Sequence, residues 1–205
     1  NIEAITFKNH GCCGHTFAAI DGLLFIMRDA QITTGDIASI AIATYGPAVS
    51  ITDRVDPKTP QECKFSMQYV LAHAAHYGSV RIEAFEADRM RDPAIRAMLG
   101  QIDLGIDSAI DAEFPSRRAA HVTVTTKDGR QLTHYQPTRK GDPDLPLSDN
   151  ELGAKFIELT NPVIGGELTN SLLQKLWQLD NISLANALGF AVATDNLAAS
   201  QDLPN

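Results

Sequence analysis

Two alternating segments around an Asp-Gly pair constrain the fold more than any other feature of this chain. Apolar and polar residues alternate over Ala119–Thr126 and over Gln131–Tyr135, and Asp128-Gly129 lies between the two runs. An Asp-Gly pair in this setting is the strongest short-range signal for a β-hairpin, because the favoured two-residue turn needs positive φ angles. The sequence therefore predicts two antiparallel strands joined at this turn.

Helical patterns alternate with further short strands along the rest of the chain. Apolar residues at helical spacing predict a helix over Thr16–Met27, with Thr16 as its N-cap. Thr59-Pro60 is typical of a helix start, and that helix is expected to end before Gly78. Further helices are expected at 92–99, 148–160, 168–179 and 182–188, and further strands at 1–8, 80–85 and 102–106. Residues 36–52 are expected to form a strand or a bent strand pair. This order lacks a clean βαβ series and predicts an α+β fold with an antiparallel sheet and packed helices.

Charge and composition exclude several classes of protein. Lys and Arg total 17 against 25 Asp and Glu, a formal net charge of −8 that argues against binding to nucleic acid. No run of apolar residues is long enough to span a membrane, and no signal peptide is recognisable. Three cysteines, two of them adjacent, do not make a disulfide framework, so we expect a reducing, cytoplasmic setting. The chain begins without Met and is expected to be part of a longer protein.

One loop concentrates the side chains that could carry chemistry. Residues 8–15 read Lys-Asn-His-Gly-Cys-Cys-Gly-His and lead directly into the first predicted helix. The free N–H groups and positive dipole end of a helix N-terminus favour an anion. The same field, with a nearby Lys or protonated His, lowers the pKa of a cysteine. The loop therefore predicts a site for an anion and for proton transfer.

Two other interpretations of this loop stay open. In the first, the cysteines are small buried residues and the histidines are solvated. In the second, His10, Cys12, Cys13 and His15 bind zinc, or the cysteine pair supports thiol redox chemistry. Adjacent ligands on one short segment suit a tetrahedral metal site poorly, and no second Cys/His pair stands at a usual spacing.

Three motifs in order along the chain resemble the MmgE/PrpD family. The first is Lys8, the Cys-Cys-Gly-His loop, and then an Ile-Asp pair at Ile20-Asp21. The second is the Phe-Ser-x-x-Tyr element ending at Tyr69, and the third is the Lys-Gly-Asp-Pro loop beginning at Lys140. One departure is Phe17, which stands where many members carry a His.

This resemblance implies a cofactor-independent lyase or isomerase. Family members include 2-methylcitrate dehydratase, cis-aconitate decarboxylase and iminodisuccinate epimerase, and the His-x-Cys-Cys-Gly-His variant is similar to the epimerase branch. The family combines a large helical domain with a smaller α+β lid domain and usually forms dimers. This chain resembles the C-terminal half, so the implied partners are an N-terminal helical half, a second copy, and a small di- or tricarboxylate.

The resemblance also assigns expected roles to single residues. Lys8, Cys13, His15 and Tyr69 are expected to be catalytic, and His10, Gly14 and Lys140 to bind substrate. In this scheme Lys8 or the helix N-terminus holds a carboxylate, while Cys13, His10 or His15 moves a proton. Tyr69 would donate to a leaving hydroxyl or to a carboxylate.

The predicted domain organisation has three parts. An α+β lid portion is expected over residues 1–145, a helical portion over 146–190 and a frayed tail over 191–205. A non-catalytic lid or interface domain remains an alternative, because the helix predicted over 60–77 carries two apolar stripes and would pack between layers.

Overall fold

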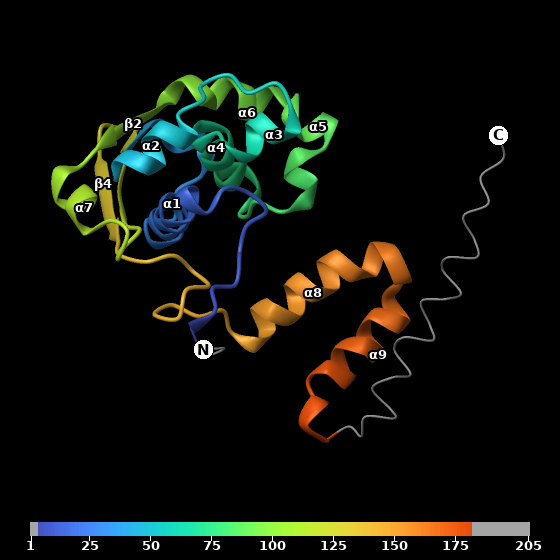
Figure 1. Ribbon diagram of the computed structural model, residues 1–205. Helices are drawn as coiled ribbons and strands as arrows, with labels where there is room; N and C mark the ends of the chain where they lie inside the picture. Colours follow the sequence, from blue (N-terminus) through green and yellow to red (C-terminus); the bar gives the residue numbers. More distant parts are fainter. Residues whose placement is uncertain (1–3, 182–205) are drawn as a thin grey trace. The chain divides into compact units, whose positions relative to one another are not determined.

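The structure is a computed structural model that describes residues 4–181 (Figure 1). The chain divides into two compact units, one ending at Leu147 and the other beginning at Ser148. The helix predicted at 182–188 and the tail predicted at 191–205 lie outside the described residues. Within the described range, no helix is both long enough and apolar enough to cross a membrane.

A four-stranded sheet organises the first unit. Its strands are β1 (Ile37–Thr44), β2 (Ile102–Ile106), β3 (Ala120–Thr126) and β4 (Gln131–Gln136), in the order β2-β1-β3-β4. β3 pairs antiparallel with β1 and with β4, whereas β2 pairs parallel with β1. The predicted α+β class is confirmed, but the sheet is mixed, because a helical crossover returns the chain to β1 in the parallel direction.

The predicted hairpin is present, but its connection is longer than the favoured two-residue turn, and of Asp128 and Gly129 only the glycine has a positive φ. Thr125 pairs with Gln131, and Gly129 has a φ of 90°. The N–H of Thr126 donates to the carbonyl of Arg130 over 2.9 Å, which closes the turn. Local turn chemistry therefore fixes the register of these two strands.

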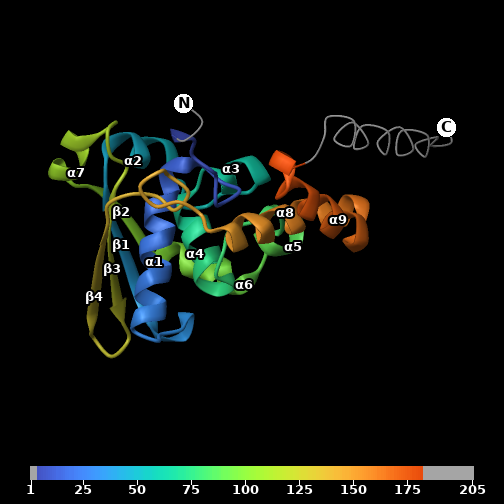
Figure 2. The ribbon, with the colours of Figure 1, turned by 90° about the horizontal axis from the view of Figure 1, so that it is seen from below.

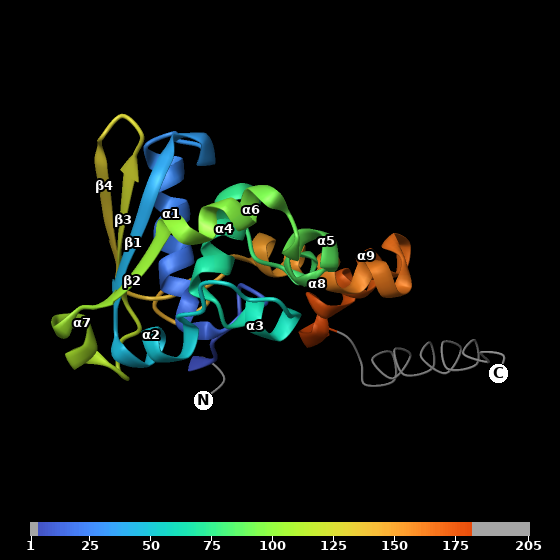
Figure 3. The same cartoon turned by 90° about the horizontal axis from the view of Figure 1, so that it is seen from above.

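Helix α1 (Phe17–Asp29) lies along one face of the sheet, and α4 (Met67–Tyr77) packs on the side of α1 away from the strands (Figures 2 and 3). Burial alternates along β3, with Val122 and Val124 fully buried. Gly22 permits close contact, because a Cβ there would stand 2.8 Å from Cγ2 of Val122. The core thus forms between α1, α4 and one face of the sheet.

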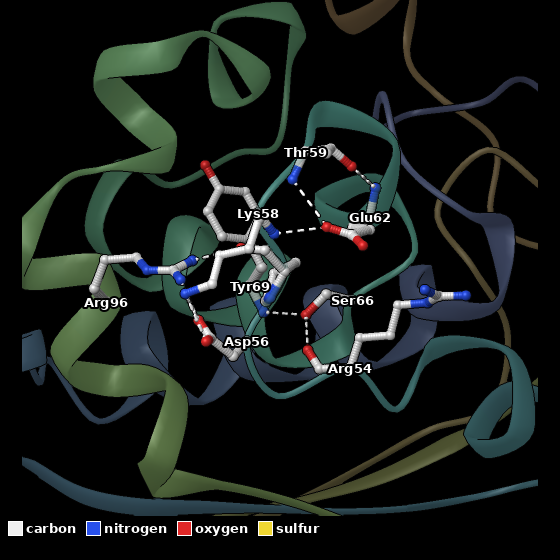
Figure 4. A network of polar contacts seen from close by, with 9 residues as sticks. Arg54, Asp56, Lys58, Thr59, Glu62, Ser66, Tyr69 and Arg96 are labelled. Atoms are coloured by element: carbon white, nitrogen blue, oxygen red, sulfur yellow. Dashed lines mark hydrogen bonds and ion pairs between the residues drawn. The ribbon is translucent and has the colours of Figure 1, made fainter.

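The single helix predicted from residue 60 to 77 is wrong in one respect, because it breaks into α3 (Pro60–Lys64) and α4. Thr59 caps α3 in a reciprocal capping box with Glu62. Ser66 caps α4: its Oγ accepts from the N–H of Tyr69 over 3.0 Å and donates to the carbonyl of Arg54 over 2.6 Å (Figure 4). Gly78, with a φ of 73°, ends α4 as predicted.

Several other predictions require correction. Residues 5–9 form no strand, and residues 80–85 contain a 3₁₀ turn, Ile82–Phe85, in place of a strand. The predicted strand at 36–52 ends at Thr44, because Pro47 stands in the first turn of α2 (Gly46–Thr52). The sequence pattern also missed α7 (Ser108–Glu113), which Asp107 caps. The remaining helices of this unit are α5 (Ala87–Met90) and the predicted α6 (Pro93–Met98).

The second unit contains α8 (Asp149–Ile164) and α9 (Gly166–Leu176) in its described part. Ser148 forms the predicted capping box with Glu151. Gly165, with a φ of 79°, separates the two helices. Gly153 lies where a Cβ would contact Leu173 at 3.6 Å, so the two helices pack closely there.

Candidate functional site

The loop at residues 8–15 is fixed at the N-terminal end of α1. The N–H of Gly11 donates to the carbonyl of Val80, and that of Cys13 donates to the carbonyl of Lys64, both over 2.9 Å. A 3₁₀ turn, Gly14–Thr16, then leads into α1. Backbone hydrogen bonds therefore hold the candidate residues in place on both sides of the loop.

The Lys-Gly-Asp-Pro loop lies against the same region. The N–H of Phe7 donates to the carbonyl of Gly141 over 2.9 Å. Gly141 has a φ of 102°, and a Cβ there would stand 2.0 Å from the carbonyl oxygen of Phe7, so only glycine fits. The structure thus brings together two motifs that are more than 130 residues apart in the sequence.

Asp21 connects these two loops, although sequence reasoning gave it no role. Its Oδ2 accepts from the backbone N–H of Lys140 over 2.7 Å, and its Oδ1 lies 3.5 Å from Nε2 of His10. His10 is buried and packs edge-on against Phe17 at 5.2 Å between ring centroids. Asp21 therefore orients His10 and anchors Lys140 through its main chain.

The other two predicted residues of this region are more open. Lys8 is exposed, and its Nζ lies 6.0 Å from the centroid of the Phe17 ring. Gly14 approaches Arg139 closely: its carbonyl accepts from Nη1 over 3.4 Å, and a Cβ at Gly14 would stand 3.1 Å from that nitrogen. Lys8 is thus accessible to a small anionic ligand, whereas the Gly14 carbonyl already contacts Arg139.

The two adjacent cysteines occupy different environments. Cys12 is 2% exposed, and its thiol lies 3.2 Å from Oγ1 of Thr16. Burial raises the pKa of Cys12 to about 12, so the expectation of a lowered pKa is wrong for this residue. Thr16 donates its hydroxyl to the carbonyl of Cys13 over 2.8 Å, and therefore does not cap α1 through its side chain. Cys13 is partly exposed and is the accessible thiol of the pair.

The zinc interpretation finds no ligand cluster in residues 4–181. No group of three or more His, Cys, Asp or Glu side chains is placed there to hold a metal ion. Cys12 points into the core, whereas His15 contacts Tyr45. The four residues proposed for that site therefore do not converge on one point in this structure.

We expect the stability of the protein to fall above about pH 9. Burial raises the pKa of Cys12 and of Tyr45 to about 12 and that of Cys63 to about 11. The unfolded chain releases these protons at lower pH than the folded one, so each group contributes stability below its unfolded pKa that is lost as pH rises. The free energy of unfolding should then drop by about 1.4 kcal/mol per pH unit for each group.

Urea denaturation between pH 7 and 11 measures this loss, and the values between pH 7 and 8 serve as the internal reference. In Cys12→Ala, the free energy of unfolding should fall less steeply with pH above about pH 9, because one of the three titrating groups is missing. An unchanged pH dependence of the free energy of unfolding in this variant would contradict the burial of a protonated thiol at Cys12.

His15 forms a pair with Tyr45, a residue that the sequence gave no signal for. Nδ1 of His15 lies 2.8 Å from the Tyr45 hydroxyl, and the two rings meet edge-on at 5.5 Å. Tyr45 is 1% exposed and stacks on Phe114 at 4.7 Å. It follows β1 directly and stands at the N-cap position of α2, so the end of the central strand positions the pair.

The protonation of this pair follows from its surroundings. Nδ1 of His15 is the one hydrogen-bond partner of the buried Tyr45 hydroxyl in the described part of the chain. We therefore assign the hydroxyl as the donor, which leaves the ring proton on Nε2. Burial, and then the charges of Arg118 and Arg139, lower the pKa of His15. At neutral pH His15 is therefore a neutral imidazole with an N–H on Nε2, a hydrogen-bond donor.

Tyr69 lies apart from these groups, inside the core. It is 0% exposed, and its hydroxyl donates a short hydrogen bond to the carbonyl of Ala84. Burial raises the pKa of Tyr69 further above its ordinary value. Ser66 of the same Phe-Ser-x-x-Tyr element caps α4, so in this structure the element starts a helix and fills the core.

We expect Tyr69→Phe to lower the free energy of unfolding by about 1–2 kcal/mol, because it leaves the Ala84 carbonyl buried without its donor. Urea denaturation measures this change, and in the enzyme proposed below kcat should stay within about threefold of the wild type. A loss of kcat by two orders of magnitude at unchanged stability would return Tyr69 to the catalytic set.

Fold and site together define an α+β domain that gathers His, Cys, Lys and Arg groups beside one helix N-terminus, an arrangement suited to small anionic substrates. The chain belongs to the MmgE/PrpD family: the model of the MmgE/PrpD C-terminal domain matches residues 10–179. The resemblance seen in the three motifs is thereby confirmed.

Curated relatives point in the same direction. Cis-aconitate decarboxylase of Mus musculus is 26% identical over 145 residues, which is 69% of this chain and 30% of the relative. The human cis-aconitate decarboxylase is 24% identical over 69% of this chain and 29% of its own length. The 2-methylcitrate dehydratase of Cupriavidus necator is 30% identical over 49% of this chain and 22% of its own. The chain thus matches less than a third of the length of each of these relatives.

Proposed function

We propose that this chain is the C-terminal domain of a lyase that moves a proton next to a carboxylate of a small di- or tricarboxylate. The family match over residues 10–179 carries the proposal. The relatives that match are named as a decarboxylase and a dehydratase, both lyases of acids with several carboxylates. We propose further that the reaction uses no cofactor, so protein groups alone stabilise the charge that develops beside the carboxylate.

In this proposal a substrate carboxylate is held at the start of α1. Lys8 is exposed there and supplies a charge-assisted hydrogen bond, while the helix N-terminus favours the anion. His10, Gly14 and Lys140 shape the binding region around it. The hydrogen bonds from Lys140 and His10 to Asp21 support this role, because they keep both loops in one position.

Stabilisation of the developing charge falls to His15, and proton transfer falls to Cys13. His15, neutral and with its proton on Nε2, donates a hydrogen bond to developing negative charge without first having to lose a proton. Cys13 offers the accessible thiol of the loop and acts as the proton carrier. These roles follow from exposure and from the His15–Tyr45 contact, and they do not include Tyr69.

The complete enzyme in this proposal contains an N-terminal helical half of the same polypeptide and forms a homodimer. The short coverage of the relatives supports the first part, because the match leaves more than two thirds of each relative without a counterpart here. Below, "full-length enzyme" means this chain joined to that half.

Proton NMR in D2O tests the proposal. The full-length enzyme and the 205-residue chain are each incubated with a panel of small di- and tricarboxylic acids. Deuterium that enters next to a carboxylate, together with a new alkene signal or loss of CO2, would support a lyase. Deuterium exchange with inverted configuration and no alkene would indicate an epimerase of the same family.

Lys8→Ala and Cys13→Ala should each abolish or strongly slow the exchange, and the exposed Lys127→Ala serves as the matched control. No exchange by the full-length enzyme with any acid of the panel would overturn the proposed activity and favour a non-catalytic lid domain.

A further inference from the structure

A polar cleft lies near the His15–Tyr45 pair, outside the carboxylate site proposed at Lys8. It has a volume of about 510 Å³ and lies wholly within the first unit. It forms where the segment before β3 meets the loop after β4. The residues that give it its charge are Arg117, Arg118, Arg139, Asp142 and Asp144.

Most of these charges are already engaged. Arg139, which is 9% exposed, binds Asp142 through two hydrogen bonds, Nε to Oδ2 over 2.8 Å and Nη2 to Oδ1 over 2.7 Å. Hydrogen bonds from Arg139 and Thr6 hold the pKa of Asp142 below its ordinary value although burial opposes ionisation. Arg117 lies 3.6 Å from Glu113. These pairs leave little net charge of their own in the cleft.

Arg118 differs from its neighbours. It is partly buried, and within residues 4–181 its guanidinium has no hydrogen-bond or ion-pair partner. A half-buried guanidinium with five donors and no acceptor favours an anion, and its planar fork fits a carboxylate. The exposed Asp144 on the same cleft opposes a second negative group there. The cleft is therefore suited to one carboxylate at a time.

The cleft lies near the His15–Tyr45 pair, and Arg118 connects the two. Arg118 and Arg139 are the charged groups that act on both His15 and Tyr45, so both arginines lie near that pair. Arg139 also reaches the carbonyl of Gly14, the residue before His15. A carboxylate on Arg118 would then lie next to the part of the molecule that presents the imidazole N–H.

We propose that this cleft binds one carboxylate of the substrate through Arg118 and so places the reacting carbon near His15. The proposal rests on the proposed function for the identity of the ligand, but the cleft itself should bind a polycarboxylate in the isolated chain. Lys8 then holds a different carboxylate of the same molecule, which favours di- and tricarboxylates over monocarboxylates.

Binding to the 205-residue chain provides the first test, with citrate as the probe and with propionate and sulfate as comparisons. We expect millimolar binding of citrate by NMR titration, with shifts at the Arg118 Nε–H and the His15 ring, and weaker binding of the other two. Arg118→Gln should raise the citrate Kd about tenfold, the loss of one charge-assisted contact. Arg118→Lys should raise it less.

Arg130→Gln is the matched control, because it removes one positive charge from the exposed hairpin turn, outside the cleft. The citrate Kd of this variant should stay within about twofold of the wild-type value. Thermal melting of Arg118→Gln should match the wild type, since within residues 4–181 the side chain has no hydrogen bond or ion pair to lose. Citrate that fails to bind, binds no better than sulfate, or binds equally well to Arg118→Gln would overturn the proposal.

Kinetics of the full-length enzyme separate this inference from the proposed function. Turnover of a polycarboxylate with an unchanged KM in Arg118→Gln would overturn the cleft proposal while the lyase stands. Citrate binding through Arg118 in an enzyme that performs no chemistry on any acid would overturn the lyase and retain the cleft.

Discussion

Replacing His15 with Ala is expected to lower kcat/KM of the full-length enzyme by about 100- to 1000-fold, the usual effect of removing one donor to developing negative charge. The reason is the Tyr45 hydroxyl, which lies 2.8 Å from Nδ1 of His15 and leaves the proton on Nε2. Steady-state kinetics with the acid identified by NMR measure the loss.

His15→Gln separates a donor from a base. A glutamine amide can donate an N–H but cannot accept a proton, so this variant should retain at least about tenfold more activity than His15→Ala. Equal loss in both variants would show that His15 acts as a base, and the assignment of its tautomer would be wrong.

Tyr45→Phe tests the partner in this pair as a positioning residue. We expect kcat to fall about tenfold, the value of one hydrogen bond, with little change in KM. The ¹⁵N chemical shifts of the His15 ring should move from those of the Nε2–H form to those of a mixture of tautomers. Unchanged ring shifts would contradict the hydrogen bond to Tyr45, whatever the rate.

Leu23→Ala is expected to have the largest effect on stability. Leu23 is 0% exposed, on the face of α1 that packs into the core, and its truncation should cost about 3–4 kcal/mol. Leu24, the next residue of the same helix, is only partly buried against that core. Leu24→Ala removes the same atoms with the same change in helix propensity and should cost about 1 kcal/mol.

Urea denaturation of both variants at pH 7 measures the two losses. Equal losses would mean that α1 is rotated about its axis relative to this structure. Because α1 begins at the candidate site, such a rotation would also move Asp21 away from His10 and Lys140.

The residues of the family motifs lie in different surroundings. Lys8 and the Cys-Cys-Gly-His loop stand at the start of α1 with accessible groups. In the Phe-Ser-x-x-Tyr element, Ser66 caps a helix and Tyr69 fills the core. In this motif a helix cap and a core side chain therefore stand where the resemblance leads us to expect a catalytic group.

Local features of the fold could be predicted from the sequence alone. The Asp128-Gly129 turn, the caps at Thr59 and Ser148, and the helix end at Gly78 each depend on residues within about four positions of one another. The loop at residues 8–15 could also be identified as a candidate site, because its unusual residues are contiguous.

Only the tertiary structure decided the contacts between distant segments. His15 meets Tyr45 across 30 residues, and Asp21 meets Lys140 across 119. The parallel pairing of β2 with β1, and the burial of Cys12 beside the accessible Cys13, likewise depend on how helices pack around the sheet. No short-range pattern encodes such contacts, because each arises from the packing of elements whose separation in sequence carries no periodic signal.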